Sequence, residues 1–354
     1  MIQKNNSTVT VDRRLIKENC NFLRTFLDPD TEITAVIKSD GYGHGAVEVA
    51  KTLEEKVSSF AVNAIQEGVE LRENDITKPI LIFEVPQKSE ALKYRSYDLT
   101  ATFSAKEHFE WVPEGISYHL NFDTGMGRLG LRPEEAKEIA QMVQNYSHLT
   151  CKGIYSHFAT ANILGSHFVE EQLQRFKELR TYFPDDLTTH ISNTGGAIYY
   201  DIEQFDRVRF GISLYGYPPG EKLVDGLKPA LNWHTHIVQM NPIKAGQSVS
   251  YGAEWQAPED GFVAVLPVGY EDGLKKREAE SRLNVRINQK EYPIVGAVTM
   301  NYTMIFLGQD DYALGTRVDL LYRGSDAYRW TENLDTIPYE VLTSIDKRIP
   351  REYI

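Results

Sequence analysis

Cysteine is scarce in this chain: Cys20 and Cys151 are the only two among 354 residues. Two thiols are too few for a disulfide scaffold or for a cysteine-rich metal site. Such usage is typical of a protein kept in a reducing compartment, so the sequence favours a cytoplasmic location.

Long apolar runs and an excess of positive charge are missing too. The amino-terminal stretch MIQKNNSTVTVDRRL has no apolar segment of the kind that a signal peptide needs. Nowhere do about 18 apolar residues run together, as a transmembrane helix requires. The net charge of -12 repels phosphate backbones and anionic lipids. We therefore predict no membrane segment and no nucleic-acid or membrane partner, with local basic sites still open.

The overall composition is that of an ordinary globular protein. Hydrophobic residues make up 42% of the chain and charged residues 25%, which is ample for a large core. A chain of 354 residues exceeds what one hydrophobic core usually supports. The length therefore predicts two domains, or one barrel with an appendage.

The first part of the chain has the rhythm of repeated βα units. From about residue 12 to residue 215, short apolar runs alternate with helical patterns such as those at 133–144 and 168–183. We expect eight strands, at 33–38, 59–63, 79–85, 99–103, 117–123, 151–156, 188–191 and 206–210. Eight such units close most simply into a (β/α)8 barrel, assigned to residues 12–227, with active groups at the carboxyl ends of its strands.

Beyond GYPPG at 216–220 the pattern changes. Strand-like runs such as HTHIVQM, GFVAVLPVGY and RLNVRI follow one another between Gly, Pro and Asn turns, and helical spacing returns only in the final segment. We predict a separate, mostly β domain over 228–354, joined by a strand from residues 1–11.

Lys38 occupies an unusual place in AVIKSDGYGHG (35–45). It ends the apolar run ITAVIK and precedes a glycine-rich turn, after which apolar residues recur at helical spacing. A surface lysine that keeps its amine in water is the commoner explanation for such a position. Three glycines, which let the backbone approach a ligand, and the hydroxyl of Tyr42 favour a functional site here.

The segment GMGRLG at 125–130 imitates the fingerprint of a dinucleotide site. That fingerprint also needs an acidic residue roughly 20 positions further on. No Asp or Glu occurs from Ile139 to Val169, so we reject NAD binding. What remains is Arg128, a fixed cation in a glycine-lined loop that can meet an anionic group of a ligand.

Three further strand ends carry polar groups. His157 follows the strand in GIYSHFATA, although a lone histidine there is more often structural than catalytic. The segments HISNTGG and RVRFGISLYG offer Asn193, Thr194, Arg209, Gly211 and Ile212. Loops after the seventh and eighth strands are the usual phosphate-binding place of such barrels, and turn glycines without a ligand are the alternative for either loop alone. A lysine amine, two phosphate loops and an arginine together suggest a pyridoxal phosphate site.

No metal site is expected. His234 and His236 alternate onto one face of LNWHTHIV, but no third ligand accompanies them. An exposed strand face explains the pair.

Six motifs in chain order carry a resemblance to a known family. AVIKSDGYGHG, NFDTGMGRLG, GIYSHFATA, VRFGISLYG, VSYGAEW and PVGYEDG together resemble the alanine racemase family, whose fold type III members depend on pyridoxal 5'-phosphate. The resemblance covers nearly the whole chain and implies an eight-stranded βα barrel followed by a β domain. It also implies a head-to-tail homodimer with shared active sites, and the interconversion of L- and D-alanine for cell-wall peptidoglycan precursors.

The resemblance assigns catalytic groups position by position. Lys38 matches the lysine that forms a Schiff base with the cofactor and serves as the base for the D-enantiomer. Tyr251, supplied by the partner chain, matches the opposing base for the L-enantiomer, because inverting a stereocentre needs a base on each face. His157 matches the histidine that hydrogen-bonds this tyrosine, and Arg209 matches the arginine paired with the pyridine nitrogen.

The remaining matches concern the phosphate and the substrate. Cofactor-binding positions of the family are matched by Tyr42, Asn193, Thr194, Gly211 and Ile212. Arg128 matches the arginine that contacts the phenolic oxygen of the cofactor and the substrate carboxylate. The amide of Met300 joins it on that carboxylate, with Asn301 beside it.

Four positions depart from the family pattern. Asn121 stands where many members have a carbamylated lysine, so its amide, alone or with a bound anion such as chloride, is left to hold Arg128. Asn301 replaces the usual aspartate, Thr194 replaces a common serine, and Lys347 falls where a phosphate-contacting tyrosine often stands. These changes leave open a serine racemase or a racemase of broad specificity.

Two other functions of the same barrel are alternatives. A non-catalytic pyridoxal phosphate carrier generally lacks the β domain, whereas Tyr251 and its flanks are present here. A decarboxylase would carry a characteristic cysteine-bearing partner loop, and none is visible. We therefore predict an isomerase.

Overall fold

The computed structural model describes residues 5–275, 283–322 and 326–354. The chain forms two compact units, one of residues 16–41 and 46–227, the other of residues 1–15, 42–45 and 228–354. The first unit is an α/β barrel and the second is mostly β, so the predicted fold class is confirmed.

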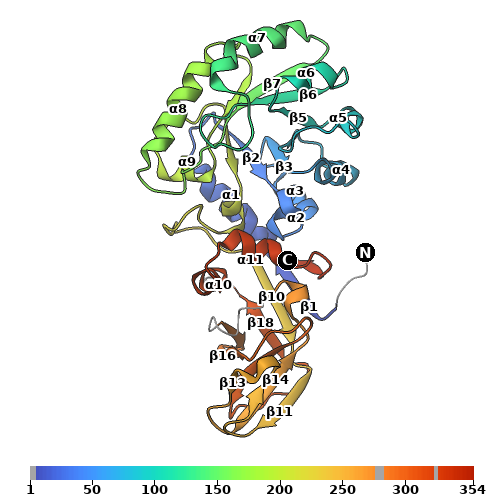
Figure 1. Ribbon diagram of the computed structural model, residues 1–354, viewed down its shortest axis with the longest axis vertical. Coiled ribbons are helices and arrows are strands. Elements are labelled where there is room, and N and C mark those ends of the chain that lie inside the picture. The colour runs from blue at the N-terminus through green and yellow to red at the C-terminus, as the bar shows by residue number, and fades with distance from the viewer. Residues whose placement is uncertain (1–4, 276–282, 323–325) are drawn as a thin grey trace. The chain divides into compact units, whose positions relative to one another are not determined.

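All eight strands predicted for the barrel are present. Figure 1 labels β2, β3, β5, β6 and β7 among them. They are β2 (Glu32–Val36), β3 (Ser59–Val62), β4 (Ile80–Ile82), β5 (Thr100–Phe103), β6 (Ser117–Asn121), β7 (Thr150–Tyr155), β8 (Thr188–His190) and β9 (Arg207–Phe210). Every pair is parallel, in the order β8-β7-β6-β5-β4-β3-β2-β9. Asp206 N–H donates to Thr189 O (3.1 Å) and Arg209 N–H to Ser192 O (3.0 Å), which joins the two end strands and nearly closes the barrel.

Helices follow the strands, as expected for βα units. They are α1 (Arg13–Arg24), α3 (Ala46–Leu53), α4 (Ile65–Glu73), α5 (Ala91–Ser96), α6 (Glu107–Trp111), α7 (Ala136–Asn145), α8 (His167–Arg180) and α9 (Thr194–Tyr199). The predicted helix at 133–144 begins with a 3-10 turn, because Pro133 suits a first turn that needs no N–H donor. The helix predicted at 168–183 ends at Arg180.

Aromatic side chains fill part of the barrel core. Phe103 on β5 stacks on Tyr118 of β6, with ring centroids 4.1 Å apart, and meets Phe109 of α6 edge to face at 5.2 Å. All three rings are fully buried. These contacts couple two neighbouring strands to the helix that connects them.

The second unit is built on one nine-stranded sheet, in the order β11-β14-β17-β16-β15-β18-β10-β1-β19. Its strands are β1 (Ser7–Val11), β10 (Leu231–His236), β11 (Gln239–Ile243), β14 (Gly261–Leu266), β15 (Asn284–Ile287), β16 (Lys290–Val295), β17 (Thr303–Gly308), β18 (Arg317–Leu321) and β19 (Arg351–Tyr353). The amino-terminal strand β1 pairs antiparallel with β10 and parallel with β19. A hairpin of β12 (Ser248–Val249) and β13 (Trp255–Gln256), and helices α10 (Asp326–Leu334) and α11 (Pro338–Ser344), complete the unit.

None of the helices in the described residues is long and apolar enough to cross a membrane. The longest barrel helix, α8, has 14 residues and carries charged side chains along its length.

Truncating Phe103 should destabilise the barrel. Phe103→Ala removes a stacked, fully buried ring, so we expect the free energy of unfolding to fall by about 3–5 kcal/mol. Urea denaturation measures the change. Leu92→Ala on α5 is the control, because Leu92 is 58% exposed and its loss should change stability by less than about 0.5 kcal/mol. Equal losses in the two variants would contradict this account of the core.

Candidate functional site

The carboxyl ends of the barrel strands gather most of the residues that the sequence singled out. Lys38 follows β2, Arg128 lies in the loop after β6, and His157 follows β7. Asn193 and Thr194 follow β8, and Arg209, Gly211 and Ile212 lie on β9 or directly after it. Because all eight strands are parallel, these ends meet at one rim of the barrel, where such folds bind their ligands.

The turn after β2 has a left-handed backbone. Ser39, Asp40, Gly41 and Tyr42 have φ values of 55°, 54°, 60° and 53°. Each non-glycine residue in this conformation costs about 1–2 kcal/mol, and such strain gathers at functional sites. Glu67 of α4 holds the turn by accepting the N–H of Ser39, and Asp40 Oδ1 accepts the N–H of Ala46 (2.9 Å) at the start of α3. The rigid turn fixes the backbone next to Lys38.

The Lys38 amine has neither a hydrogen bond nor an ion pair within the described part of the chain. Burial, and then the positive charge of Arg128, lower the pKa of this amine below 10.5, while Glu67 opposes the shift. A lowered pKa increases the neutral fraction of an amine, which is the nucleophilic form. Lys38 is therefore suited to covalent bonding with a carbonyl group.

Arg209 is a buried cation held by neutral acceptors. Its Nη1 donates to His190 Nδ1 (2.6 Å), and its Nη2 donates to Ser156 O (2.8 Å), Ile191 O (2.9 Å) and His157 Nδ1 (3.2 Å). Burial lowers the pKa of Arg209 to about 10, so the guanidinium stays charged at neutral pH. Across the described residues, its Nε–H is the guanidinium donor left without an acceptor. That donor is available to a ligand.

Arginine can only donate, and this settles the proton positions of three histidines. His190 Nδ1 must accept from Arg209, so His190 Nε2 carries the proton that it shares with His119 Nδ1 (2.9 Å). His157 faces two donors, Arg209 Nη2 at 3.2 Å from Nδ1 and Asn193 Nδ2 at 3.5 Å from Nε2. The shorter contact makes Nδ1 the acceptor, so His157 Nε2 carries the proton. Burial, followed by the nearby arginines, lowers the pKa of His119 to about 3 and that of His190 well below 6.5. Both rings are therefore neutral donors and acceptors.

Tyr155 packs under this network. Its ring stacks on His190 with centroids 5.0 Å apart and planes 3° from parallel, and Arg209 lies 5.4 Å from the ring centroid. The sequence motifs did not single out His119, His190 or Tyr155 as site residues. Two signals were available: His190 opens the quoted HISNTGG, and His119 shares a strand face with Asn121.

The loops after β8 and β9 meet beside this network. Thr194 Oγ1 accepts the N–H of Gly211 (3.3 Å), and Asn193 Oδ1 accepts the N–H of Gly196 (3.0 Å). Asn193 also forms an isolated bridge with Arg209. Ser192 Oγ is buried and has no hydrogen-bond partner in the described structure. Hydroxyls and backbone amides at paired loops suit an anionic group such as a phosphate.

Asn121 does not use its amide donor on Arg128. Its Nδ2 donates to Leu129 O (3.0 Å) and Ser104 Oγ (3.3 Å). Arg128 is exposed and has no ion-pair partner among the residues that the structure describes. Asp123 Oδ1 accepts the N–H groups of Gly125 and Gly127, both at 3.0 Å, which shapes the loop that carries this arginine. Arg128 is therefore free to meet a carboxylate.

The second unit carries the other predicted residues. Tyr251 is 77% exposed and Met300 is 52% exposed, and Asn301 is also on the surface. Tyr42 is buried in this unit, with its ring 5.9 Å from that of Tyr339 on α11. Met300 N–H donates to no acceptor in the described parts of the chain.

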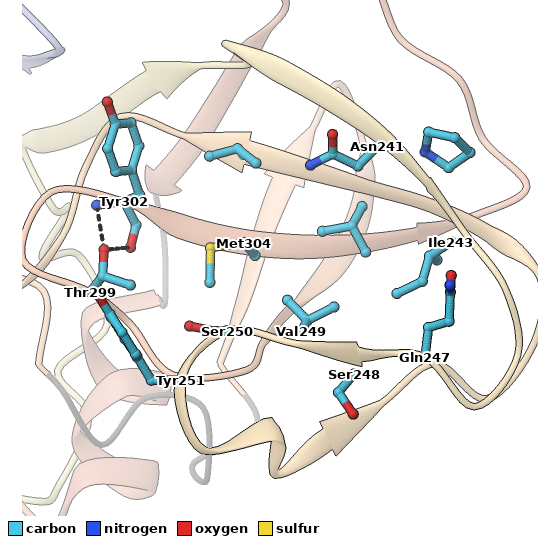
Figure 2. Close-up of a pocket in the computed structure, with 13 residues that line it drawn as sticks. Asn241, Ile243, Gln247, Ser248, Val249, Ser250, Tyr251, Thr299, Tyr302 and Met304 are labelled. Atoms are coloured by element: carbon cyan, nitrogen blue, oxygen red, sulfur yellow. Dashed lines mark hydrogen bonds between the residues drawn. The ribbon is translucent and has the colours of Figure 1, made fainter.

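Tyr251 stands at one end of a cleft in this unit (Figure 2). The cleft has a volume of about 960 Å³ and its apolar wall consists of Ile243, Val249, Val263, Val265 and Met304. Thr299 and Tyr302 lie at the same end as Tyr251. Ser250, with φ of 68°, donates from Oγ to Ala297 O (2.7 Å) and fixes the backbone before Tyr251. Of the residues singled out by sequence, only Tyr251 lines this cleft.

No group of three or more His, Cys, Asp or Glu side chains that could hold a metal ion occurs among the described residues. His234 and His236 lie on β10, and burial lowers the pKa of His234 below 6.5.

Comparisons with known proteins agree along the whole chain. The family model described as "Alanine racemase, N-terminal domain" matches residues 11–219, and "Alanine racemase, C-terminal domain" matches residues 230–353. The alanine racemase of Geobacillus stearothermophilus is 33% identical over 96% of this chain and 92% of its own length. The crystal structure of alanine racemase from E. faecalis has a TM-score of 0.93 at 32% identity and covers 100% of both chains. Alanine racemase from Bartonella henselae, solved with covalently bound pyridoxal phosphate, has a TM-score of 0.88 at 27% identity, covering 99% and 100% of the two chains.

Acid should destabilise the folded protein through His119 and His190. Their folded pKa lies below the ordinary 6.5, so the unfolded chain binds more protons as the pH falls below that value. Their contribution to stability is therefore fully present above pH 6.5 and is lost on acidification towards the folded pKa, about 3 for His119. Each ring lowers stability by up to about 1.4 kcal/mol per pH unit in that window. Urea midpoints at several pH values measure the slope.

The variant His119→Gln tests the contribution of His119 to the pH dependence of stability. The glutamine carbonyl can accept from His190 but does not titrate, so the acid-induced loss should be smaller than in the wild type. His167→Gln is the control, since the His167 side chain is 92% exposed and its replacement should leave the slope unchanged. The same slope in His119→Gln and wild type would show that His119 is not held neutral.

Proposed function

This chain belongs to the alanine racemase family and has the isomerase activity of that family, and we propose that it inverts alanine by a two-base mechanism on pyridoxal 5'-phosphate. The observation that carries the mechanism is the arrangement at the barrel rim. Lys38 has a lowered pKa and no partner within the described residues, while Arg209 keeps its Nε–H unused. A carbonyl-bearing aromatic cofactor with a ring nitrogen needs both groups.

The donor set fits the cofactor. Lys38 would hold its aldehyde carbon, Arg209 its ring nitrogen, and Thr194, Gly211 and Ile212 its phosphate, together with Tyr42 and Asn193. The buried Ser192 hydroxyl, which lacks a partner in the described structure, is a further polar atom beside these loops. When bound, pyridoxal phosphate withdraws electrons from the α-carbon of the amino acid and makes its proton acidic.

Arg209 would control how strongly the bound cofactor withdraws electrons from the α-carbon. The arginine stays protonated at neutral pH, because even its lowered pKa is about 10. A permanent donor to the ring nitrogen of the bound cofactor would disfavour protonation of that nitrogen. Five acceptors around Arg209 prevent it from turning away. Reduced electron withdrawal suits an enzyme that must return the proton rather than proceed to other reactions.

Lys38 and Tyr251 are the two bases in this proposal. Lys38 takes and returns the α-proton on the face used for D-alanine, and the Tyr251 hydroxyl of a second chain acts on the face used for L-alanine. His157 Nε2 carries a proton, as its bond from Arg209 requires, and can donate it to the oxygen of a deprotonated tyrosine. The exposed position of Tyr251 is compatible with its use by another subunit.

Arg128 and the Met300 amide are proposed to bind the substrate carboxylate, with Asn301 beside them. Arg128 has no anionic partner in the described chain, and Met300 N–H has no acceptor there. A guanidinium and an amide are both strong donors to a carboxylate. They orient the α-carbon without taking part in proton transfer.

We further propose the wider setting of the reaction. Residues 12–227 act as the cofactor-binding domain, and 228–354 with the strand from 1–11 act as the domain lent to a partner in a homodimer. The exposed Tyr251 and Met300 support this division of labour. Two free cysteines are compatible with work in the cytoplasm, where D-alanine would serve peptidoglycan synthesis.

Replacing the two bases separately should give different defects. Tyr251→Phe should lower racemisation from L-alanine by about 10³-fold while α-proton exchange of D-alanine in D₂O persists, because Lys38 remains. Lys38→Ala should abolish both reactions and the cofactor absorbance. Tyr182→Phe, at a tyrosine 51% exposed on the barrel, is the control and should keep full activity. Undiminished turnover of L-alanine by Tyr251→Phe would refute the two-base assignment.

Serine is the second candidate substrate. Asn121 spends its amide on Leu129 and Ser104 rather than on Arg128, so the carboxylate site differs from the family pattern. A fold shared across the family does not by itself select a side chain. Measured kcat/KM for L-alanine should exceed that for L-serine by at least about tenfold, since one added hydroxyl in a small pocket shifts discrimination by that order. A higher value for L-serine would make the protein a serine racemase.

A further inference from the structure

The segment that carries Met300 is tied to the segment that follows β14. Tyr270 N–H donates to Thr299 O (3.0 Å) and Glu271 N–H donates to Met300 O (3.1 Å). Gly269 leaves no room between them, because a Cβ there would lie 2.3 Å from Thr299 O and 2.4 Å from Met300 O. On its other side the segment closes on itself, with Thr299 Oγ1 bonded to both the N–H and the carbonyl of Tyr302 (Figure 2).

A series of side-chain hydrogen bonds connects to the same segment. Asn301 Nδ2 donates to Glu271 Oε2 (2.8 Å), and Arg348 Nη2 donates to Glu271 Oε1 (3.1 Å). Arg348 Nε also donates to Asp346 Oδ2 (2.9 Å). Glu271 thus links the Met300 segment to the stretch before β19, in which Lys347 is the neighbour of Arg348.

The order of donors and acceptors in this series of hydrogen bonds favours a donor at position 301. Arginine can only donate and an ionised carboxylate can only accept, so a side chain that faces Glu271 Oε2 should be a donor. Asparagine supplies an N–H. Aspartate, which is usual in the family at this position, would place a second carboxylate at hydrogen-bond distance from the first and repel it.

We propose that Glu271 is a positioning residue for the substrate carboxylate, acting through Asn301 on the Met300 amide. This inference rests on the proposed function, which assigns that amide to the substrate. Backbone bonds at Thr299 and Met300 hold one edge of the segment, and the Glu271–Asn301 bond holds the next residue. The asparagine at 301 is then a donor matched to Glu271, rather than an isolated loss of charge.

A double-mutant cycle tests the pair. Asn301→Asp should raise KM for L-alanine about fivefold with kcat within about twofold of the wild type, since binding is weakened while the bases are untouched. Adding Glu271→Gln should bring KM back to within about twofold, because the new side-chain amide donates to the new carboxylate. Glu271→Gln alone should have a smaller effect than Asn301→Asp. Such non-additivity is not expected of a merely destabilising change.

Asn284→Asp is the matched control. Asn284 Nδ2 donates to Glu291 Oε2 (3.3 Å) on the exposed β15–β16 hairpin, so this variant brings the same two carboxylates together elsewhere in the unit. It should leave KM unchanged. An equal rise of KM in Asn284→Asp, an unchanged KM in Asn301→Asp, or effects of the two site variants that simply add would each overturn the proposal.

Hydrogen exchange separates this inference from the proposed function. Amides of the peptide spanning 298–303 should exchange several-fold faster in Asn301→Asp than in the wild type and return towards wild-type rates in the double variant. If exchange follows this pattern while the wild type fails to racemise alanine, the pairing stands and the assigned reaction falls. Unchanged exchange together with normal racemisation would leave the reaction standing and remove the role given to Glu271.

Discussion

The rest of the site depends on one buried cation, Arg209, that has no carboxylate partner in the described parts of the chain. The five described acceptors of its Nη atoms are carbonyl groups and imidazole nitrogens on β8 or directly after β7 and β8. A carboxylate in the same place would neutralise the charge and would accept the same protons. Neutral acceptors instead leave the positive charge of Arg209 uncompensated. Because arginine can only donate, they also make Nδ1 of His157 and of His190 an acceptor, which fixes the tautomer of each ring.

The two units contribute opposite kinds of chemistry. The barrel rim holds amines, guanidinium groups and amides, which suit a phosphate, a ring nitrogen and a carboxylate. The β unit contributes a phenol at Tyr251 and a backbone amide at Met300 on an exposed surface. Proton transfer on both faces of one carbon needs groups from opposite directions, and a single barrel rim offers only one direction. This geometric requirement supports the proposal of a site shared between chains.

Much of this could be predicted from the sequence because the strands are short, apolar and regularly spaced. Seven of the eight barrel strands lie within two residues of their expected limits, and β4 ends three residues before its expected end at residue 85. Lys38, His157 and Thr194 follow strands as anticipated. The partners of Arg209 were not foreseen, since His119 and His190 are 71 residues apart and meet only when β6, β7 and β8 align. The same holds for Glu271 and Asn301, which lie 30 positions apart and are joined by the pairing of β14 with β17.

The sequence by itself determined the order of the units, the ends of the strands and the residue types available there, because hydrophobic spacing and turn chemistry are local properties. Tertiary structure alone decided which donors and acceptors pair and which donors remain unused. Asn121 turns to Leu129, Arg209 keeps one N–H, and Glu271 recruits Asn301, and each outcome depends on distances between segments remote in the chain. Hydrogen bonds require contact within about 3 Å, and only folding creates such contact.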